Sequence, residues 1–304
     1  MLRLFVPGIV FAASFALLPD AVGADSPAVV TILEGSATVI RGTSKLGAAE
    51  GVRVQPNDLF ETGKDSFARL EFDDGVRLDV GPLSRLQLNH PTEVSADRPA
   101  LYLLSGWIKL SLDDTKRLRA PAFSTLLFDG TELGGVVLAR VDARGGAVFI
   151  EQGRARLVNR HGKPFAVPPL KTNDFVSISK DGRAVAEPHM PSEFVDQMPR
   201  AFRDSIPSRY GRYREHEVAA RSLGDFSYAE AEPWINAELS VRRQFVHTWR
   251  SKADDPAFRL DLTAKLSLHP EWGPVLFPEL YAPKAPGDFV GPPWPLPEAG
   301  AKPR

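Results

Sequence analysis

The chain has 304 residues, more than a typical single domain, so one large or two smaller folded units are expected. Its formal net charge of −1 argues against a general attraction to nucleic acid or to anionic membranes. It contains no cysteine, which excludes disulfides and thiolate metal sites.

The first 24 residues have the pattern of a secretory signal peptide. Arg3 precedes an apolar run from Leu4 to Leu18, and Val22-Gly23-Ala24 supplies the small residues typical of a cleavage site. The run is shorter than a typical membrane span, and Pro7 interrupts it, so an uncleaved anchor is the weaker alternative. We predict cleavage after Ala24 and a periplasmic or secreted protein without an integral membrane span after cleavage.

Residues 25–187 predict an all-β domain, because apolar and polar residues alternate between frequent turn residues. The expected strands are Val29–Leu33, Ala37–Arg41, Phe67–Phe72, Val76–Val80, Arg85–Leu88, Leu101–Leu104, Trp107–Leu112, Val136–Val141, Ala147–Glu151, Ala155–Asn159 and Phe175–Ser179.

The stretch 67–80 predicts an antiparallel hairpin with a three-residue turn at Asp73-Asp74-Gly75, in which Gly75 takes the left-handed conformation. A two-residue turn would mix apolar and charged side chains on both faces. The three-residue turn sorts them, with an apolar face of Phe72–Val76, Leu70–Leu78 and Ala68–Val80 pairs and a charged face of Glu71–Arg77 and Arg69–Asp79 pairs. We therefore expect a core on one side of this sheet.

Two segments of this region resemble one another. Leu33–Val39 is similar to Glu151–Leu157, and each is followed by an Asn-Asp pair, at Asn57-Asp58 and at Asn173-Asp174. The similarity predicts either stacked or coiled β-units, or a chance likeness between two turns.

After Pro188 the composition changes, and residues 188–270 predict a helical region. The expected helices are Ser192–Ile206, Ala237–Arg250 and Pro256–Leu268, the last with Asp255 as N-cap and Pro256 at the first helical position. From Pro270 the chain is rich in proline, and residues 271–304 predict an extended tail with no core of its own.

The motifs of residues 28–187 together resemble the FecR domain, the extracytoplasmic domain of the iron-citrate regulator family. The matching residues, in chain order, are Glu34-Gly35-Ser36-Ala37-Thr38-Val39, Asn57-Asp58, Thr62-Gly63, Ser66, Ala68, Leu70, Phe72, Asp74-Gly75, Leu78, Val80, Pro82, Ser84, Gly130-Thr131-Glu132 and Glu151-Gln152-Gly153. Asn57 stands where the family usually has glycine, a mild change because asparagine also tolerates the left-handed region.

This resemblance implies a fold, a mainly β FecR-like domain of antiparallel or coiled strands, and an extracytoplasmic compartment. The family's regulators carry a cytoplasmic sigma-factor-binding segment and a membrane span before this domain, whereas here the predicted signal peptide directly precedes it. The chain thus resembles a stand-alone member without the anti-sigma segment.

Candidate binding residues lie in an arginine-rich window with only three acidic residues, Asp204, Glu215 and Glu217. They are Arg200, Arg203, Arg209, Tyr210, Arg212, Tyr213 and Arg214. Such residues could dock on phosphate groups of the outer membrane or on another anionic partner, although a solvated helical face is the commoner reason for such a sequence. Four tryptophans of the last third could likewise anchor a partner or simply cover the β-domain, namely Trp234, Trp249, Trp272 and Trp294.

No catalytic or cofactor motif is present. The six histidines are scattered, no HExxH, GxSxG, P-loop or dinucleotide motif occurs, and turn formation explains Asp73 and Asp74 better than a cation site does. We predict no cofactor, no metal and a non-enzymatic binding or scaffold module with an envelope protein or glycan as partner and no role for nucleic acid. The alternatives are an accessory of cell-surface signalling and, less favoured, a glycan-acting enzyme with two carboxylates.

Overall fold

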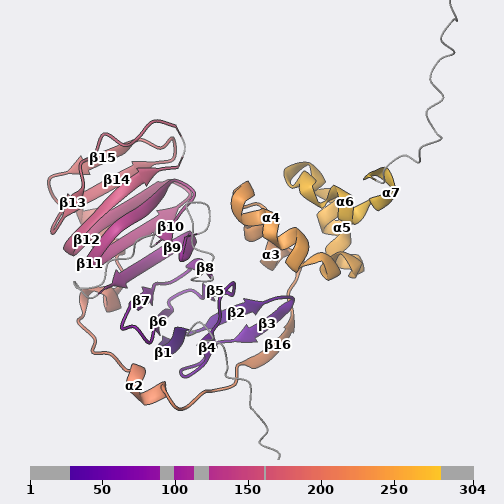
Figure 1. Cartoon of the computed structure of the whole chain (residues 1–304), viewed down its shortest axis with the longest axis horizontal. Coiled ribbons are helices and arrows are strands. Elements are labelled where there is room, and N and C mark those ends of the chain that lie inside the picture. Colours follow the sequence, from indigo (N-terminus) through magenta and orange to yellow (C-terminus); the bar gives the residue numbers. More distant parts are fainter. Residues whose placement is uncertain (1–27, 90–98, 113–122, 161, 282–304) are drawn as a thin grey trace, which may run out of the picture.

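The computed structural model describes residues 28–89, 99–112, 123–160 and 162–281, and within them the fold is mainly β (Figure 1). The strands are β1 (Ala28–Glu34), β2 (Ala37–Arg41), β3 (Ser44–Gly47), β4 (Arg53–Val54), β5 (Leu59–Thr62), β6 (Phe67–Glu71), β7 (Arg77–Val80), β8 (Arg85–Leu88), β9 (Leu101–Ser111), β10 (Phe123–Ser124), β11 (Phe128–Asp142), β12 (Gly145–Asn159), β13 (Leu170–Lys171), β14 (Phe175–Ser179), β15 (Ala184–Glu187) and β16 (Arg221–Asp225). The helices are α1 (Ser192–Gln197), η2 (Arg200–Arg203), α2 (Tyr210–Tyr213), α3 (Tyr228–Ile235), α4 (Leu239–Thr248), η3 (Arg250–Asp254), α5 (Pro256–Ala264), η4 (Leu266–Leu268), η5 (Pro270–Trp272), α6 (Gly273–Leu276) and α7 (Pro278–Tyr281).

The strands form two packed layers that share the long strand β9. Its first half pairs with β8, in a layer that continues through β5, β2, β3 and β16, and its second half pairs with β7, which continues through β6 and β1. β9 changes layers at Gly106, whose φ of +100° is left-handed. A main core of apolar side chains fills the space between the layers and includes Val39, Phe60, Leu70 and Ile108. The prediction of a mainly β, two-layered or coiled domain is confirmed.

The hairpin formed by β6 and β7 has the predicted register. Ala68 pairs with Val80, Arg69 with Asp79, Leu70 with Leu78, and Glu71 with Arg77. The Phe72 N–H donates to the Val76 carbonyl at 3.0 Å, and Gly75 has a φ of +87°. The apolar face of the hairpin enters the main core, as the alternation predicted.

The charged face of this hairpin is also buried, so the expectation of a core on one side only is wrong. Residues 188–220, which we call the strap, follow β15 around the sheet and lead to β16, as the chain trace in Figure 1 shows. Phe194 and Phe202 of the strap are buried in a second apolar cluster with Phe67, Trp107 and Phe175. The outer face of the other layer is covered as well, because Ile40, Leu59 and Tyr102 lie in a third cluster with side chains of α3–α6.

The helices differ from their predicted extents where proline intervenes. Ser192–Ile206 is two short helices, α1 and η2, because Pro199 between them cannot continue a helix. Asp255 caps α5 as predicted, since its carboxylate accepts hydrogen bonds from the N–H groups of Ala257 and Phe258 at 2.8 and 3.0 Å. The expected extended tail is wrong as far as Tyr281, because η5, α6 and α7 follow Pro270 and Trp272 is fully buried. The rest of the tail, Trp294 and the predicted signal peptide lie outside the described residues.

The two Asn-Asp segments form the same turn but belong to different pairings. Asn57 and Asn173 have φ values of +69° and +72°, and the Asp58 and Asp174 carboxylates each accept from the N–H three residues earlier. In the first segment, β2 pairs with β5, the strand that follows the Asn57-Asp58 turn. In the second segment, the residues after Gly153 pair with β13, which precedes the Asn173-Asp174 turn. The structure therefore favours a likeness between turns over a repeated β-unit.

Candidate functional site

Buried charges on the outer face of β6, β7 and β9 hold the strap by its main chain. Arg69 is 4% exposed, forms a two-pronged ion pair with Asp79 at 2.5 and 2.8 Å, and donates a third bond to the Ile206 carbonyl at 2.6 Å. Lys109 donates to the Phe202 carbonyl at 2.7 Å and pairs with Glu151 at 2.8 Å. These contacts satisfy the buried charges, which would otherwise be costly to bury.

Glu71 also binds the strap, but as a hydrogen-bond acceptor, whereas Arg69 and Lys109 are donors. Its carboxylate accepts from the Arg209 N–H at 2.9 Å, from the Thr31 hydroxyl at 2.7 Å and from the Ser208 hydroxyl. Burial acts to raise the pKa of Glu71, but these hydrogen bonds to the ionised form prevail and lower the pKa below its ordinary value. The carboxylate is therefore held in its charged form.

Aromatic side chains fix the strap at two further points. The Phe194 ring lies 4.9 Å from the rings of both Trp107 and Phe175, and the Phe202 ring lies 6.3 Å from that of Phe67, measured between centroids. Aromatic contacts at Phe194 and Phe202 and main-chain contacts at Phe202, Ile206 and Arg209 together give this part of the strap a single defined path.

The predicted binding residues lie on this strap and mostly face solvent. All five of the predicted arginines are exposed, namely Arg200, Arg203, Arg209, Arg212 and Arg214. Tyr213 is buried instead, and its hydroxyl donates to the Glu50 carboxylate at 2.5 Å, a bond that raises the pKa of Tyr213 above its ordinary value. Tyr210 is partly buried.

Two of these arginines are already engaged. The Arg203 guanidinium donates to the Val195 carbonyl, and Arg209 lies 3.9 Å from Glu50. Among the described residues, Arg200, Arg212 and Arg214 form no ion pair, although the Arg212 guanidinium lies 5.4 Å from the ring centroid of Tyr213. The strap thus brings the predicted cations to one solvent-facing segment but uses its tyrosines partly for packing.

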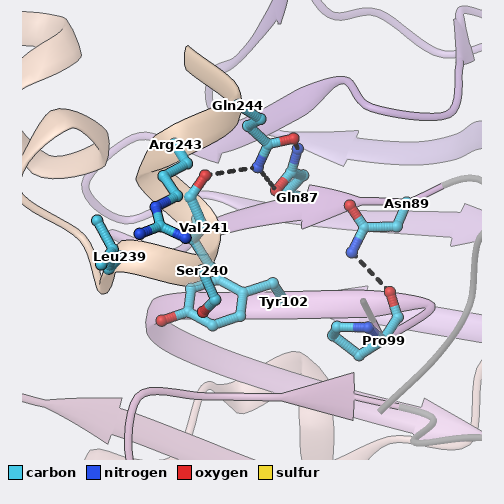
Figure 2. A pocket seen from close by; sticks show the side chains of 9 residues that line it. All are labelled: Gln87, Asn89, Pro99, Tyr102, Leu239, Ser240, Val241, Arg243 and Gln244. Carbon is cyan, nitrogen blue, oxygen red and sulfur yellow. Dashed lines mark hydrogen bonds between the residues drawn. The ribbon is translucent and has the colours of Figure 1, made fainter. Parts of the chain in front are cut away.

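A second candidate site is a cleft where the helices meet the sheet (Figure 2). It encloses about 580 Å³ and is lined by Gln87, Asn89, Pro99 and Tyr102 of the sheet and by Leu239, Ser240, Val241, Arg243 and Gln244 of α4. Gln87 and Gln244 exchange two hydrogen bonds of 2.9 Å, and a further hollow of about 360 Å³ lies beyond this pair, next to Asp58 and Trp249.

Sequence reasoning missed this cleft because neutral amides carry no motif. The one available signal was the alternation of Gln87 and Asn89 with the buried residues Leu86 and Leu88, which places both amides on the same outer face.

Two tryptophans and a group of partly buried ions serve the contact between helices and sheet. The Trp234 indole N–H donates to Glu61 at 2.7 Å, and that of Trp249 donates to the Gly42 carbonyl at 2.9 Å. Arg160 of the segment after β12 pairs with Asp129 and with Glu238, at the start of α4, each at 2.9 Å. Covering the β-domain is therefore the observed role of Trp234 and Trp249.

Neither a metal centre nor a membrane-spanning helix is found in the described ranges. No three His, Asp or Glu side chains of these residues are placed to hold a metal ion. No helix of the same residues is both long and apolar enough to cross a bilayer. Asp58 has a structural role, because its carboxylate pairs with Arg41 at 2.7 Å and accepts a hydrogen bond from the Gln55 N–H. Burial raises the pKa of this carboxyl group above its ordinary value.

Among known proteins, similarity is found only to solved structures, at low sequence identity. No protein-family model matches the sequence, and no curated protein does. Two crystal structures of a candidate anti-sigma factor from Parabacteroides distasonis ATCC 8503 are similar, at 15% and 13% identity, each with a TM-score of 0.35. Each match covers 45% of this chain and 62% of the other, so less than two thirds of that protein is spanned.

Proposed function

We propose that the chain is a non-enzymatic, FecR-like module of the cell envelope that binds an anionic partner through the exposed arginines of its strap. The ordered motifs of residues 28–187 support the family, and the register of the β6–β7 hairpin agrees with the motif's pattern of apolar and charged positions. The partner that fits best is a phosphate-bearing surface such as that of the outer membrane, because guanidinium groups bind phosphate in a planar, two-pronged manner.

The observation that carries this proposal is the fixed path of the strap. Buried Arg69, Glu71 and Lys109 anchor its main chain between Phe202 and Arg209, and Arg53 donates to the Arg214 carbonyl at 3.0 Å. The exposed residues Arg200, Arg212 and Arg214 form no ion pair among the described residues. A fixed backbone reduces the ordering entropy lost on binding, so three cations without an ion pair form a better anion site on it than the same residues on a flexible loop would.

A non-enzymatic role agrees with how the buried and partly buried carboxylates are used. Glu71 and Asp79 hold the strap and its arginine, Asp129 and Glu238 share Arg160, and Asp58 closes a turn. A glycan-acting enzyme needs two carboxylates that converge on a substrate, whereas each of these is engaged with protein groups.

Vesicle sedimentation with residues 25–304, the chain expected after signal cleavage, tests the proposal. We expect binding to vesicles that contain lipid A but not to neutral phosphatidylcholine vesicles, with loss at high salt. The triple variant R200S/R212S/R214S should bind on the order of a hundredfold more weakly, because each arginine near an anionic surface contributes about 1 kcal/mol.

The matched control is R154S/R183S/R250S, which removes three exposed arginines outside the strap and changes the net charge equally. If both triple variants lose binding to the same extent, the interaction reflects overall charge and the strap has no special role. If the wild-type chain ignores lipid A vesicles, the proposed partner is wrong.

A further inference from the structure

The cleft between β8, β9 and α4 has hydrogen-bonding capacity that the protein does not use. Gln87 is 2% exposed, and its pairing with Gln244 engages one of its two amide hydrogens. Asn89 donates one amide hydrogen to the Pro99 carbonyl at 2.6 Å, which leaves its second hydrogen and its oxygen without a partner among the described residues. Figure 2 shows Gln87 next to Gln244 of α4, and Asn89 farther from the helix with its amide directed toward Pro99.

The spacing of these amides matches an extended peptide. Gln87 and Asn89 are two residues apart, so their side chains lie on one face with a separation of roughly 7 Å along the strand direction. One edge of an extended chain presents a main-chain N–H and C=O pair at the same interval of two residues. An extended peptide that lies along β8 could therefore meet one amide at every second residue.

The remaining walls add apolar contacts and one cation. Pro99, Tyr102, Leu239 and Val241 offer apolar surface for side chains, and Arg243 on α4 supplies a positive charge. The volume of about 580 Å³ is ordinary for a ligand site. The sheet already recognises main chain in this way elsewhere, since Arg69 and Lys109 bind strap carbonyls through their side chains.

We propose that this cleft binds an extended peptide with an acidic end, through its main chain at Gln87 and Asn89 and through its carboxylate at Arg243. The inference is independent of the anion-binding role of the strap, because the two sites share no residue.

The test uses fluorescence anisotropy with a labelled hexapeptide of alternating Thr and Val that ends in Glu with a free carboxyl group. Its twin ends in an amidated Gln, and a tetramer of N-acetylglucosamine represents glycans. We expect Arg243→Ala to weaken binding of the acidic peptide about tenfold and to leave the amidated twin almost unchanged, since only the first has a charge-assisted bond to lose. Asn89→Ala should weaken both peptides, and Arg250→Ala, an exposed arginine outside the cleft, should weaken neither.

Nuclear magnetic resonance of the side-chain amides supplies a readout that a general loss of fold would not mimic. The signals of Gln87 and Asn89 should shift on addition of either peptide in the wild type, while the R200S/R212S/R214S variant should keep the same response. The proposal is overturned if neither peptide binds at millimolar concentration, if binding survives both Arg243→Ala and Asn89→Ala, or if only the sugar tetramer binds.

Discussion

At the scale of single residues, Glu71 shows how a charge predicted to face solvent became a structural anchor. We expect Glu71→Gln to destabilise the protein by about 1–3 kcal/mol at pH 7, because a neutral amide replaces a buried acceptor of three hydrogen bonds. Chemical unfolding in urea measures this change. Glu34→Gln, on the neighbouring strand β1 at an exposed position, is the matched control and should have almost no effect.

The pH dependence of that difference follows from the lowered pKa of Glu71. A carboxyl group whose pKa is lower in the folded state stabilises the fold fully above its ordinary value of 4.5, and this contribution is lost as the pH falls through the folded-state value. The gap between wild type and Glu71→Gln should therefore narrow in acid. A gap that stays constant from pH 7 to pH 3 would mean that the carboxylate does not ionise differently in the folded and unfolded states.

At the scale of elements, the bend of β9 at Gly106 joins the two layers. A Cβ at Gly106 would lie 2.3 Å from the Ser84 Cα, whereas a Cβ at Gly42 would meet no atom within 4 Å. Both glycines have positive φ, so alanine is strained at either position, but only Gly106 also lacks space. We expect Gly106→Ala to cost about 2–5 kcal/mol and Gly42→Ala about 1–2 kcal/mol, as thermal or urea unfolding would show. Equal losses would mean that backbone strain, and not the close approach of Ser84, determines the bend.

Local patterns predicted the elements that alternation and turn chemistry determine. The β6–β7 hairpin, the ends of β2, β8 and β14, and the cap of α5 all follow from residues that are close in sequence. Two strands were each predicted as a pair of shorter ones. β9 was predicted as 101–104 and 107–112, and β12 as 147–151 and 155–159. Each is one strand, because Gly106 and Gly153 bend a strand without ending it.

Contacts between distant residues could not be predicted in this way. Arg69 and Glu71 are balanced by cross-strand neighbours in the hairpin, so nothing local reveals that residues 206–209 cover them. The same holds for the cleft, where Gln87 meets an amide 157 positions later. The arginines of the candidate site were visible in the sequence, but the fixed path that separates the free cations from the engaged ones depends on these distant contacts.

At the scale of the whole molecule, the β-domain is completed by the chain that follows it. We expect residues 25–187 alone to be aggregation-prone or molten, because this truncation removes Phe194 and Phe202 from the aromatic cluster and the strap carbonyls that accept hydrogen bonds from Arg69 and Lys109. Burial of two phenylalanines contributes about 3–6 kcal/mol, and domains are stable by only about 5–15 kcal/mol, so the loss is comparable to the entire stability.

Three chains distinguish this interdependence from simple addition of modules. Residues 25–281 should melt in one transition and remain monomeric in size-exclusion chromatography, because the strap and helices both cover sheet faces. Residues 25–225 keep the strap and β16 but expose Ile40, Leu59 and Tyr102, so this chain should bind the dye ANS and melt at a lower temperature. Residues 25–187 should show no cooperative melt. A monomeric 25–187 chain with a sharp melting transition would contradict this interdependence. It would mean that the β-domain folds without the strap, and that the strap's contacts with Arg69 and Lys109 add little to its stability.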